Sequence, residues 1–584
     1  MKLPSGLPVP NIHPNSLEIM KRRHLKHDEE GNVIEKPKEM FWRVANSIGT
    51  KDLDYGETED VAEATSREFY TVMAMNEFLP GSRVLFEAGN NKSHQLSSCF
   101  VLPIEDSLEG IFETMKDAAI VQKNNGGTGF NFSKVRPKGD MVNGVPNVGA
   151  GPVHFIRSFS VAFDQILQGM KRGGGNMAIL NIDHPDIMEF INMKGTDASI
   201  RNFNTSIGIT NKFMQAVKDK TDFELINPRT GYGVAKVDAN ELFDIICQKA
   251  WECADPGLAF IDEIQDKNPT KDLGVIDATN PCGEEPLRPY ESCNLGSIVL
   301  PTHVINGEIN WDKLAITSRT ATHFLENMID ASHFPLQKIQ EEVTKTRKLG
   351  VGIVGLGQMF YMLKLSYNSQ EAVTLCEKII AFIQEECTKE SEALALKRGV
   401  FPGFKNSKWD QMGRKVRNAT MTSIAPTGTL SLVANTSSGM EPVFSLVYIR
   451  KSFYQDKVKS DQSSKETIVS DPIFEEELKR REIYSEELMR RVAKEGTIAH
   501  IDEIPSDMKK IFVTTHDISP EFHVRMQAAA QKNVDAAVSK TINMPHTALV
   551  EDVKKAYLLA WELKCKGTTI YRDGSKGDQV LSNA

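Results

Sequence analysis

No Cys-x-x-Cys pair occurs anywhere in this sequence, and only eight cysteines are spread over its 584 residues. That usage excludes a disulfide-stapled scaffold and gives little support to a structural zinc site. The sequence also lacks any apolar run of about 18 residues, so no membrane-spanning helix is expected. Its start, MKLPSGLPVPNIHPNS, has no apolar core of a secretory signal. We therefore expect a cytoplasmic protein, in which any working disulfide is transient.

An excess of positive charge is missing as well. Lys and Arg number 69 against 78 Asp and Glu, which gives a formal net charge of −9. No basic face for nucleic acid is therefore expected. The 40% hydrophobic and 25% charged fractions are those of an ordinary globular protein.

The chain divides into two parts by pattern. Residues 1–95 are expected to be mostly helical, because EMFWRVANSIG and SREFYTVMAMNEFLPGS have helical periodicity. In residues 96–584, short β-rich runs such as AILNI, NTSIGIT and VGIVGL alternate with helix-like segments. This alternation predicts one large α/β body. The charged stretch from about residue 451 to 510 is expected to be a helical insertion at its surface.

Two short patterns resemble ligand sites but favour ordinary structure. LGVGIVGLG (349–357) has the glycine spacing of a dinucleotide fingerprint, yet a helix-like segment precedes it, which predicts a helix-to-strand turn. NIDHPDIMEF offers Asp183, His184 and Asp186 without a second His/Cys cluster. Because Asp-x-x-Asp before an apolar run is an ordinary helix start, we expect a helix there and no metal site.

Five of the cysteines lie in helix-like segments and are expected to be packing residues: Cys247, Cys253, Cys376, Cys387 and Cys565.

The other three, Cys99, Cys282 and Cys293, each lie at the edge of a β-like run. A thiol and a carboxylate two residues apart on a turn, such as Cys282 and Glu284, can face one substrate, with the carboxylate as acid or base. A further pair of thiols can supply two electrons and close to a disulfide. Each thiol alone would more often be a buried packing group. Together they match the groups of a reductase that acts on an unreactive carbon.

Two stretches here resemble a known family. NPCGE (280–284) and CNLGS (293–297) are similar to the finger loop and redox strand of ribonucleotide reductase large chains. The resemblance continues through LSSCFVLPIEDSLEGIF, GGTGFNFSKVRPKG, GMKRGGGNMAILNIDHPDI, RKLGVGIVGLGQ, IAPTGTLSLVANTSSGMEP and SKTINMP, and so covers roughly residues 75 to 575. It implies an α/β barrel of ten strands in two five-stranded halves, with Cys282 on a loop inside.

The resemblance implies a role for each matching residue of this centre. Cys282 would become the thiyl radical that takes the 3′ hydrogen from the ribose. Glu284 would accept the proton of the 3′ hydroxyl, while Asn280 would hydrogen-bond nearby to hold the substrate. Cys99 and Cys293 would be the dithiol that reduces the 2′ carbon as water leaves.

Substrate and effector contacts follow from the same resemblance. The family's residues that contact the substrate correspond to Ser82, Ser98 and Gly127 in this sequence. The residues that bind its phosphates correspond to Thr427, Gly428, Thr429 and Ser431. A Thr/Gly/Thr/Ser loop offers N–H groups and hydroxyls to an anion, although an ordinary turn before a helix is the alternative. The family also has a specificity site, where a bound deoxynucleoside triphosphate selects which base of the substrate is reduced. The residues of that site correspond to Asp106, Arg136, Gln168 and Arg172. Three consecutive glycines in QGMKRGGGNM give a switching loop its backbone freedom.

The family has three sources for the radical. A separate metal-bearing subunit works with two adjacent tyrosines, whereas here Tyr571 stands alone between Ile570 and Arg572. A glycyl radical needs an Arg-Val-x-Gly-Tyr stretch, which the sequence lacks. NPCGE, IAPTGTLS and SKTINMP are most similar to the third class, class II, which uses adenosylcobalamin. No Asp-x-His-x-x-Gly signature is present, so no histidine is expected to bind the cobalt.

We therefore expect reduction of ribonucleotides, taken as diphosphates, to 2′-deoxyribonucleotides. Two alternatives stay open: the same chemistry driven by a metal-bearing subunit, and a catalytically silent nucleotide-binding regulator. The expected reductant is a thioredoxin-like protein or a separate Cys-x-x-Cys chain, because no such pair ends this sequence, although truncation is another explanation. A homodimer is expected. Overall control by ATP and dATP is not, because no extra N-terminal nucleotide-binding module is evident.

Overall fold

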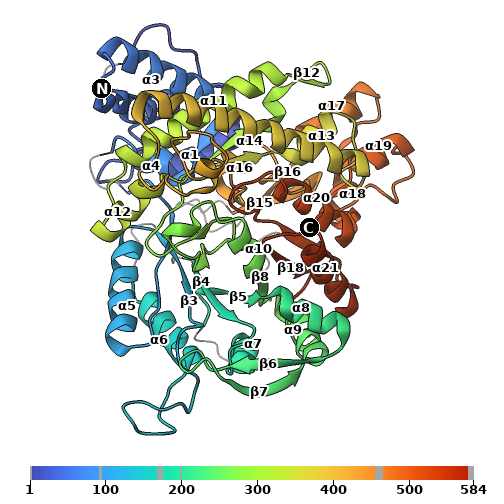
Figure 1. Ribbon diagram of the computed structural model, residues 1–584. Helices are drawn as coiled ribbons and strands as arrows, with labels where there is room; N and C mark the ends of the chain where they lie inside the picture. The colour runs from blue at the N-terminus through green and yellow to red at the C-terminus, as the bar shows by residue number, and fades with distance from the viewer. Residues whose placement is uncertain (1–2, 91–94, 167–174, 197–199, 454–463, 576–584) are drawn as a thin grey trace.

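The computed structural model describes residues 3–90, 95–166, 175–196, 200–453 and 464–575. Helices of the N-terminal region and of the middle of the chain form one layer, and a strand-rich body with its own outer helices forms the rest (Figure 1). Within these ranges, no helix has the length and apolar character needed to cross a membrane.

The N-terminal helices pack together and against a long helix from the middle of the chain. They are α1 (Pro14–Arg23), α2 (Pro37–Gly49), η1 (Thr50–Tyr55), α3 (Glu59–Ala74) and α4 (Ser82–Glu87). Thr58 caps α3 by accepting a hydrogen bond from the backbone N–H of Val61. Buried Phe69 of α3 makes an edge-on ring contact with Phe324 of α11 (Trp311–Ala331).

A seven-stranded sheet forms the strand-rich body. In spatial order its strands are β17 (Thr541–Met544), β18 (Gly567–Arg572), β8 (Gly257–Phe260), β5 (Phe203–Ile209), β4 (Asn176–Asn181), β3 (Gly127–Asn131) and β2 (Cys99–Val101). The five strands from β8 to β2 run parallel, β18 is antiparallel to β8, and β17 is parallel to β18.

Helices connect these strands, as the alternating pattern predicts. They are α5 (Leu108–Lys123), α6 (Pro152–Asp164), α7 (Ile187–Thr196), α8 (Asn211–Asp219), α9 (Ala239–Cys253), α10 (Ile261–Asp266), α20 (Pro520–Gln531) and α21 (Val550–Glu562), with a hairpin of β6 (Asp222–Ile226) and β7 (Gly233–Asp238) among them. The predicted helix start at 183–186 is confirmed, because α7 begins at Ile187. His184 Nε2 lies 2.8 Å from the Val135 carbonyl oxygen, and its Nδ1 accepts from the Asp186 N–H.

A second sheet has three strands, in the order β1 (Phe78–Pro80), β11 (Leu295–Val299) and β14 (Gly350–Val354). β11 and β14 are parallel, and β1 is antiparallel to β11. Single bridges link this sheet to the first one: Phe100↔Ser292, Val351↔Thr422 and Ile424↔Val538. The fold is therefore α/β as predicted, but its main strands are assigned to two sheets joined by isolated bridges rather than to one continuous ladder.

The glycine-rich stretch at 349–357 is the predicted helix-to-strand turn. Helix α12 (Gln337–Thr346) ends just before β14 begins at Gly350. A Cβ on Gly352 would lie 2.5 Å from the Ser423 carbonyl oxygen. These glycines therefore allow close packing of neighbouring strands.

The insertion at 451–510 differs from the expectation. It opens with a hairpin, β15 (Val447–Phe453) paired with β16 (Ser464–Ser470), and only then continues as α17 (Pro472–Arg480), α18 (Glu486–Glu495) and α19 (Ser506–Ile511). The all-helical expectation is wrong for the hairpin. Its strands, VYIRKSF and SKETIVS, contain the β-favouring residues Val, Tyr, Ile, Phe and Thr, but adjacent charges such as Arg450-Lys451 and Lys465-Glu466 leave no period-2 alternation to detect.

The remaining elements are short, apart from α14 (Gln370–Arg398). They are η2 (Lys271–Leu273), β9 (Ala278–Thr279), β10 (Pro286–Leu287), η3 (Leu300–His303), β12 (Val304–Ile305), β13 (Glu308–Ile309), α13 (Leu356–Met362), α15 (Lys408–Gln411), α16 (Gly428–Ala434) and η4 (Thr515–Asp517).

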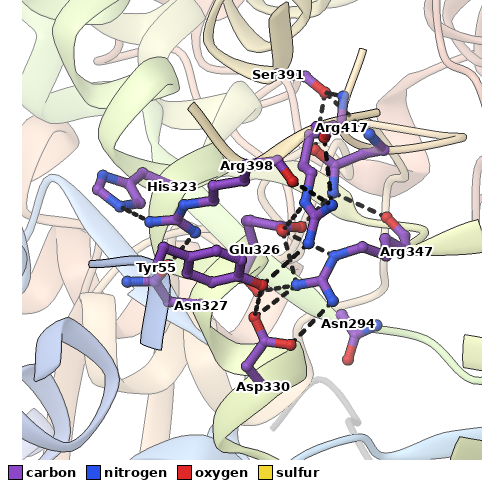
Figure 2. Close-up of polar contacts among 12 residues, drawn as sticks. Tyr55, Asn294, His323, Glu326, Asn327, Asp330, Arg347, Ser391, Arg398 and Arg417 are labelled. Carbon is purple, nitrogen blue, oxygen red and sulfur yellow. Dashed lines mark hydrogen bonds and ion pairs between the residues drawn. The ribbon is translucent and has the colours of Figure 1, made fainter. Parts of the chain in front are cut away.

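A buried charged network joins the N-terminal region to the middle of the chain (Figure 2). Glu326 of α11 accepts hydrogen bonds from Arg347 at 2.7 Å, from Arg417 at 2.8 Å and from Asn418 at 2.6 Å. Tyr55 of η1 accepts from Arg417 at 3.0 Å. Each buried charge therefore has partners, which is the condition for holding charges away from water.

Candidate active site

A hairpin loop carries the first group of predicted catalytic residues. β9 and β10 pair antiparallel and leave residues 280–285 as the loop between them. Asn280 closes this loop twice: its backbone N–H donates to the Glu285 carbonyl at 3.1 Å, and its Oδ1 accepts from the Glu285 N–H at 3.0 Å. The Glu284 carbonyl accepts from Ala537 and Ser423, so segments on both sides hold the loop.

Two glycines of β3 make room for this hairpin. A Cβ on Gly129 would lie 1.9 Å from the Thr279 carbonyl oxygen, and a Cβ on Gly127 would lie 3.2 Å from the Pro281 ring. No side chain fits at Gly129 without moving the hairpin. The GGTGF stretch is therefore explained by the close approach of the loop. Gly127, a predicted substrate contact, donates its N–H to the Ser98 carbonyl at 2.7 Å.

Cys99 and Cys293 lie together. Cys99 begins β2, Cys293 precedes β11, and the Cys293 N–H donates to the Cys99 carbonyl at 3.1 Å. A hydrogen bond from the Cys99 thiol to Cys293, together with burial, raises the pKa of Cys99 well above its usual value, so its thiol stays protonated. All eight cysteines are free thiols in this structure. The two thiols are therefore neighbours, which is the arrangement that a dithiol requires.

Glu284 and Asn280 adjoin this pair. Both are buried, and the Glu284 charge contributes to the raised pKa of Cys99. Burial raises the pKa of Glu284 to about 7, and the Asn280 amide moderates that rise. Within the part of the chain that the structure describes, Glu284 Oε2 and Asn280 Nδ2 have no hydrogen-bond partner at ordinary geometry. Unsatisfied buried polar atoms of this kind are rare and indicate a place for a ligand.

Cys282 lies on the same loop, two residues before Glu284, and unlike the dithiol pair it is exposed. Gly283 follows it with φ +81°, and a Cβ added there would meet nothing within 4 Å. The tip of the loop is therefore next to open space. A buried acid and an exposed thiol thus lie two residues apart on one short turn.

A cleft of about 200 Å³ gathers most of the predicted substrate contacts. Ser82 and Ser98 line it together with Thr427, Gly428 and Thr429. Leu295, Gly296 and Ser297 of β11, just beyond Cys293, also line it. The cleft is thus continuous with the strand that follows the dithiol. Its lining residues carry no charged side chain.

The Thr427 loop is held in an unusual conformation. Thr427 has φ +52°, which is rare for a β-branched residue, and its Oγ1 accepts a hydrogen bond from the Gly439 N–H at 2.7 Å. Ser431 does not line the cleft. Its hydroxyl donates to the Gly428 carbonyl at 3.0 Å, so it supports the loop from behind.

The predicted effector residues that the structure describes form an ion pair away from this cleft. Arg136 Nε lies 2.9 Å from Asp106 Oδ2, and both side chains are partly exposed. Gln168 and Arg172 lie outside the described residues.

The other five cysteines are apart from the site. Burial raises the pKa of Cys376, Cys387 and Cys565 to about 12 and that of Cys247 further. The Cys253 thiol donates to the Lys249 carbonyl oxygen at 3.3 Å. They pack as predicted.

Comparison with known proteins agrees with this geometry. A family model described as "Ribonucleotide reductase, barrel domain" matches residues 97–571, and one described as "Ribonucleotide reductase, all-alpha domain" matches residues 11–93. The chain belongs to the ribonucleotide reductase family. This reductase chain is similar to the vitamin B12-dependent ribonucleoside-diphosphate reductase of Thermoplasma acidophilum, 43% identical over 97% of this chain and 80% of the relative. The enzyme of the same name from Mycobacterium tuberculosis is 41% identical, with the same coverage.

A solved structure shares the fold of this reductase chain. It is the Actinobacillus ureae class Id ribonucleotide reductase alpha subunit, with a TM-score of 0.78 and 22% identity over 96% of this chain and 97% of that chain.

Sequence reasoning missed three residues beside the site. Glu285 is buried, and burial with the charge of Glu284 raises its pKa to about 8. Arg23 Nη1 donates to Thr429 Oγ1 at 2.8 Å, and His24 Nε2 lies 2.7 Å from Ser82 Oγ. A basic run at the end of a helix is so common that only the tertiary contacts single these two out.

Proposed function

We propose that this chain is an adenosylcobalamin-dependent reductase that converts ribonucleoside diphosphates to 2′-deoxyribonucleoside diphosphates. One observation carries the proposal: the Cys99–Cys293 dithiol adjoins the unpartnered polar atoms of Asn280 and Glu284, on the loop that bears Cys282. The names of the relatives at 41–43% identity support both the diphosphate and the cofactor.

Each residue of the site has its own step in the proposed reaction. The Cys282 thiyl radical takes the 3′ hydrogen atom of the ribose, and Glu284 accepts the proton of the 3′ hydroxyl. The 2′ hydroxyl then leaves as water. Cys99 and Cys293 provide two electrons and two protons, and they end as a disulfide. Cys282 returns the hydrogen atom to C3′ and is a radical again.

The protonation states suit these roles. The raised pKa of Cys99 keeps that thiol protonated and therefore able to give hydrogen. The pKa of Glu284, about 7, allows that side chain to accept and return a proton near neutral pH. The unpartnered Nδ2 of Asn280 can donate to a substrate hydroxyl.

The loop tip fits the cofactor. Adenosylcobalamin, when bound, supplies the oxidant for the Cys282 thiol. Cys282 is exposed and the space beside Gly283 is open, so the cofactor would approach at the tip of this loop. Tyr571 has no second tyrosine beside it in β18, which argues against the tyrosine relay of the subunit-driven alternative.

The cleft is the proposed substrate site. Thr427, Gly428 and Thr429 would bind the phosphates through N–H groups and hydroxyls, and open space beside Gly428 supports this. Ser82, Ser98 and Gly127 would contact the nucleoside side, and Ser431 would hold the phosphate loop in shape. A deoxynucleoside triphosphate would bind at Asp106 and Arg136, with Gln168 and Arg172 as further contacts.

The assembly is also part of the proposal. Leu108 and Phe112 of α5 and Val161 of α6 are at least half exposed, which supports a homodimer through these helices. A thioredoxin-like protein or a Cys-x-x-Cys chain would re-reduce the disulfide, and working thiols suit a cytoplasmic location.

Two features of the fold, the closure of the barrel and the domain boundary, are also proposed. We propose a closed barrel of two antiparallel halves. β2, β3, β4, β5 and β8 would form one half, and β11, β14, the segment at 422–424, β17 and β18 the other. The parallel bridges Val351↔Thr422 and Ile424↔Val538 support the second half. We also propose a domain boundary near residue 95, where the two family models adjoin.

An assay with purified chain, adenosylcobalamin and dithiothreitol tests the function. We expect deoxynucleotide from ribonucleoside diphosphates, little from triphosphates, and none from a Cys282→Ala variant. Cys253→Ala, a cysteine of α9 away from the site, is the matched control and should keep full activity. Substantial deoxynucleotide from Cys282→Ala, or turnover that needs a metal-bearing second protein instead of the cofactor, would refute the proposal.

A further inference from the structure

The proposed phosphate cleft poses an electrostatic problem. Its lining residues are glycines, hydroxyl residues and apolar residues, without a charged side chain among them. A nucleoside diphosphate carries at least two negative charges. Anionic groups taken out of water need charged partners as well as hydrogen bonds. A cation from outside the lining is therefore expected.

Arg23 is such a cation. It is the last residue of α1, it is exposed, and its Nη1 donates to Thr429 Oγ1 at 2.8 Å. Thr429 lines the cleft directly. The guanidinium therefore lies at the rim of the cleft, on the loop proposed for the phosphates. Arginine suits this position because its planar fork matches phosphate oxygens.

Helix α1 is fixed against the same loop. Ser16 is buried, and its hydroxyl donates to the Leu432 carbonyl of α16 at 3.1 Å. Met20 is also buried in the main core. The end of α1 is thus held beside residues 428–434, and Arg23 does not depend on a loop to reach the cleft.

The next residue reaches a second wall of the cleft. His24 is 1% exposed, and its Nε2 lies 2.7 Å from the hydroxyl of Ser82, which lines the cleft. His24 Nδ1 is buried without a hydrogen-bond partner. Burial, and then the charge of Arg23, lowers the pKa of His24 to about 4, so the ring is neutral. A neutral ring can orient the Ser82 hydroxyl without adding a second charge.

We propose that Arg23 binds the terminal phosphate of the ribonucleoside diphosphate and that His24 positions the Ser82 hydroxyl toward the same substrate. The inference rests on the proposed function. It makes the end of α1 a wall of the active site, although α1 belongs to the helical N-terminal region. Arg23 is a binding residue in this scheme, and His24 acts through Ser82.

Binding of cytidine diphosphate and cytidine monophosphate to the full chain tests Arg23. Arg23→Gln should weaken diphosphate binding and raise KM by roughly 10- to 100-fold, the range of a charge-assisted hydrogen bond, with kcat nearly unchanged. Monophosphate binding should change little, and Arg23→Lys should recover part of the affinity. Arg22→Gln, one residue earlier and also exposed, is the control and should behave as the wild type.

The outcomes separate this inference from the proposed function. If the wild type reduces the diphosphate and Arg23→Gln leaves KM and binding unchanged, the inference is wrong and the function stands. If the wild type binds no nucleoside diphosphate, both are wrong. An equal loss for monophosphate and diphosphate would assign Arg23 a structural role and overturn the inference.

A double-mutant cycle tests His24. If His24 acts through Ser82, the combined His24→Gln and Ser82→Ala variant should lose no more kcat/KM than Ser82→Ala alone. Losses that multiply would contradict this role. Urea unfolding of each variant checks that the chain is folded at the assay temperature.

Discussion

Two buried glutamates of this chain have opposite surroundings. Glu326, in the network of Figure 2, is fully buried and accepts hydrogen bonds from two guanidinium groups and an amide. Glu284, on the hairpin loop, is 2% exposed, and one of its oxygens has no hydrogen-bond partner at ordinary geometry among the described residues. Burial removes both carboxyl groups from water, which costs free energy. Only Glu326 offsets that cost by hydrogen bonds to charged groups within the fold.

The difference separates a structural acid from a chemical one. Arg347 and Arg417 both donate hydrogen bonds to Glu326, so it can hold η1, α11 and the segment at 417–418 together. Glu284 has no such cation, so its pKa rises to about 7 and a proton can be gained or lost. An unsatisfied buried carboxylate lowers stability, and its retention points to function.

The largest effect is expected from Glu284→Gln, which removes the acid that has no cation beside it. Without a proton acceptor, kcat should fall by about 10²- to 10⁴-fold, the usual range for a general acid–base group. Stability should rise instead. Folding raises the pKa of Glu284, so its cost to stability grows from about pH 4.5 to about pH 7 and is complete above that. Urea unfolding at about pH 8 should show a gain of about 1 to 3 kcal/mol, which vanishes near pH 4 to 5.

Loss of stability in this variant at about pH 8, or activity within threefold of wild type, would contradict the assignment. Glu63→Gln, an exposed member of a surface pair with Arg67, is the control for both measurements and should change neither by much.

Glu326→Gln should do the reverse. Removing this buried charge leaves Arg417 without its anion and Arg347 with Asp330 alone, and costs about 3 to 5 kcal/mol. Urea unfolding measures this loss, and the same Glu63→Gln control should lose less than about 1 kcal/mol. Activity per folded molecule should persist. A variant as stable as Glu63→Gln would show that the network contributes little.

This contrast could not be predicted from the sequence. Both residues are simply glutamates there, and the partners of Glu326 come from helix ends and loops far apart in the chain. The cysteine roles were predictable because short motifs carry them, but the contact of Cys99 with Cys293 depends on β2 lying beside the segment before β11. The α/β class followed from the alternation of short β-rich and helical runs.

Two errors have physical causes. The hairpin of β15 and β16 was missed because its strands hold adjacent charges and no period-2 alternation, and such charges suit a solvated helix as readily as an edge hairpin. Arg23 was missed because cations in the last turn of a helix normally just complement the helix dipole. Its contact with Thr429 is tertiary, and no local signal marks it.

A smaller effect is expected in the pH dependence of kcat/KM, which tests whether Glu284 is the group that titrates. Glu284 must be ionised to accept the proton, so kcat/KM should rise about tenfold per pH unit below 7 and level off above it. Substrate affinity measured in parallel separates this rise from titration of the substrate phosphate. A flat profile from about pH 5.5 to 8 would exclude Glu284 as the acceptor.

The smallest expected effect concerns Glu285, the neighbour of Glu284. Burial, and then the charge of Glu284, raises the pKa of Glu285 to about 8, so it is neutral while Glu284 titrates. Glu285→Gln should therefore leave the rise of kcat/KM near pH 7 in place, with a midpoint moved by less than about half a unit, and remove any second change near pH 8. A midpoint displaced by a full unit or more would mean that the two carboxyls share one proton and act as a pair. In that case the contrast with Glu326 would belong to the Glu284–Glu285 pair rather than to Glu284 alone.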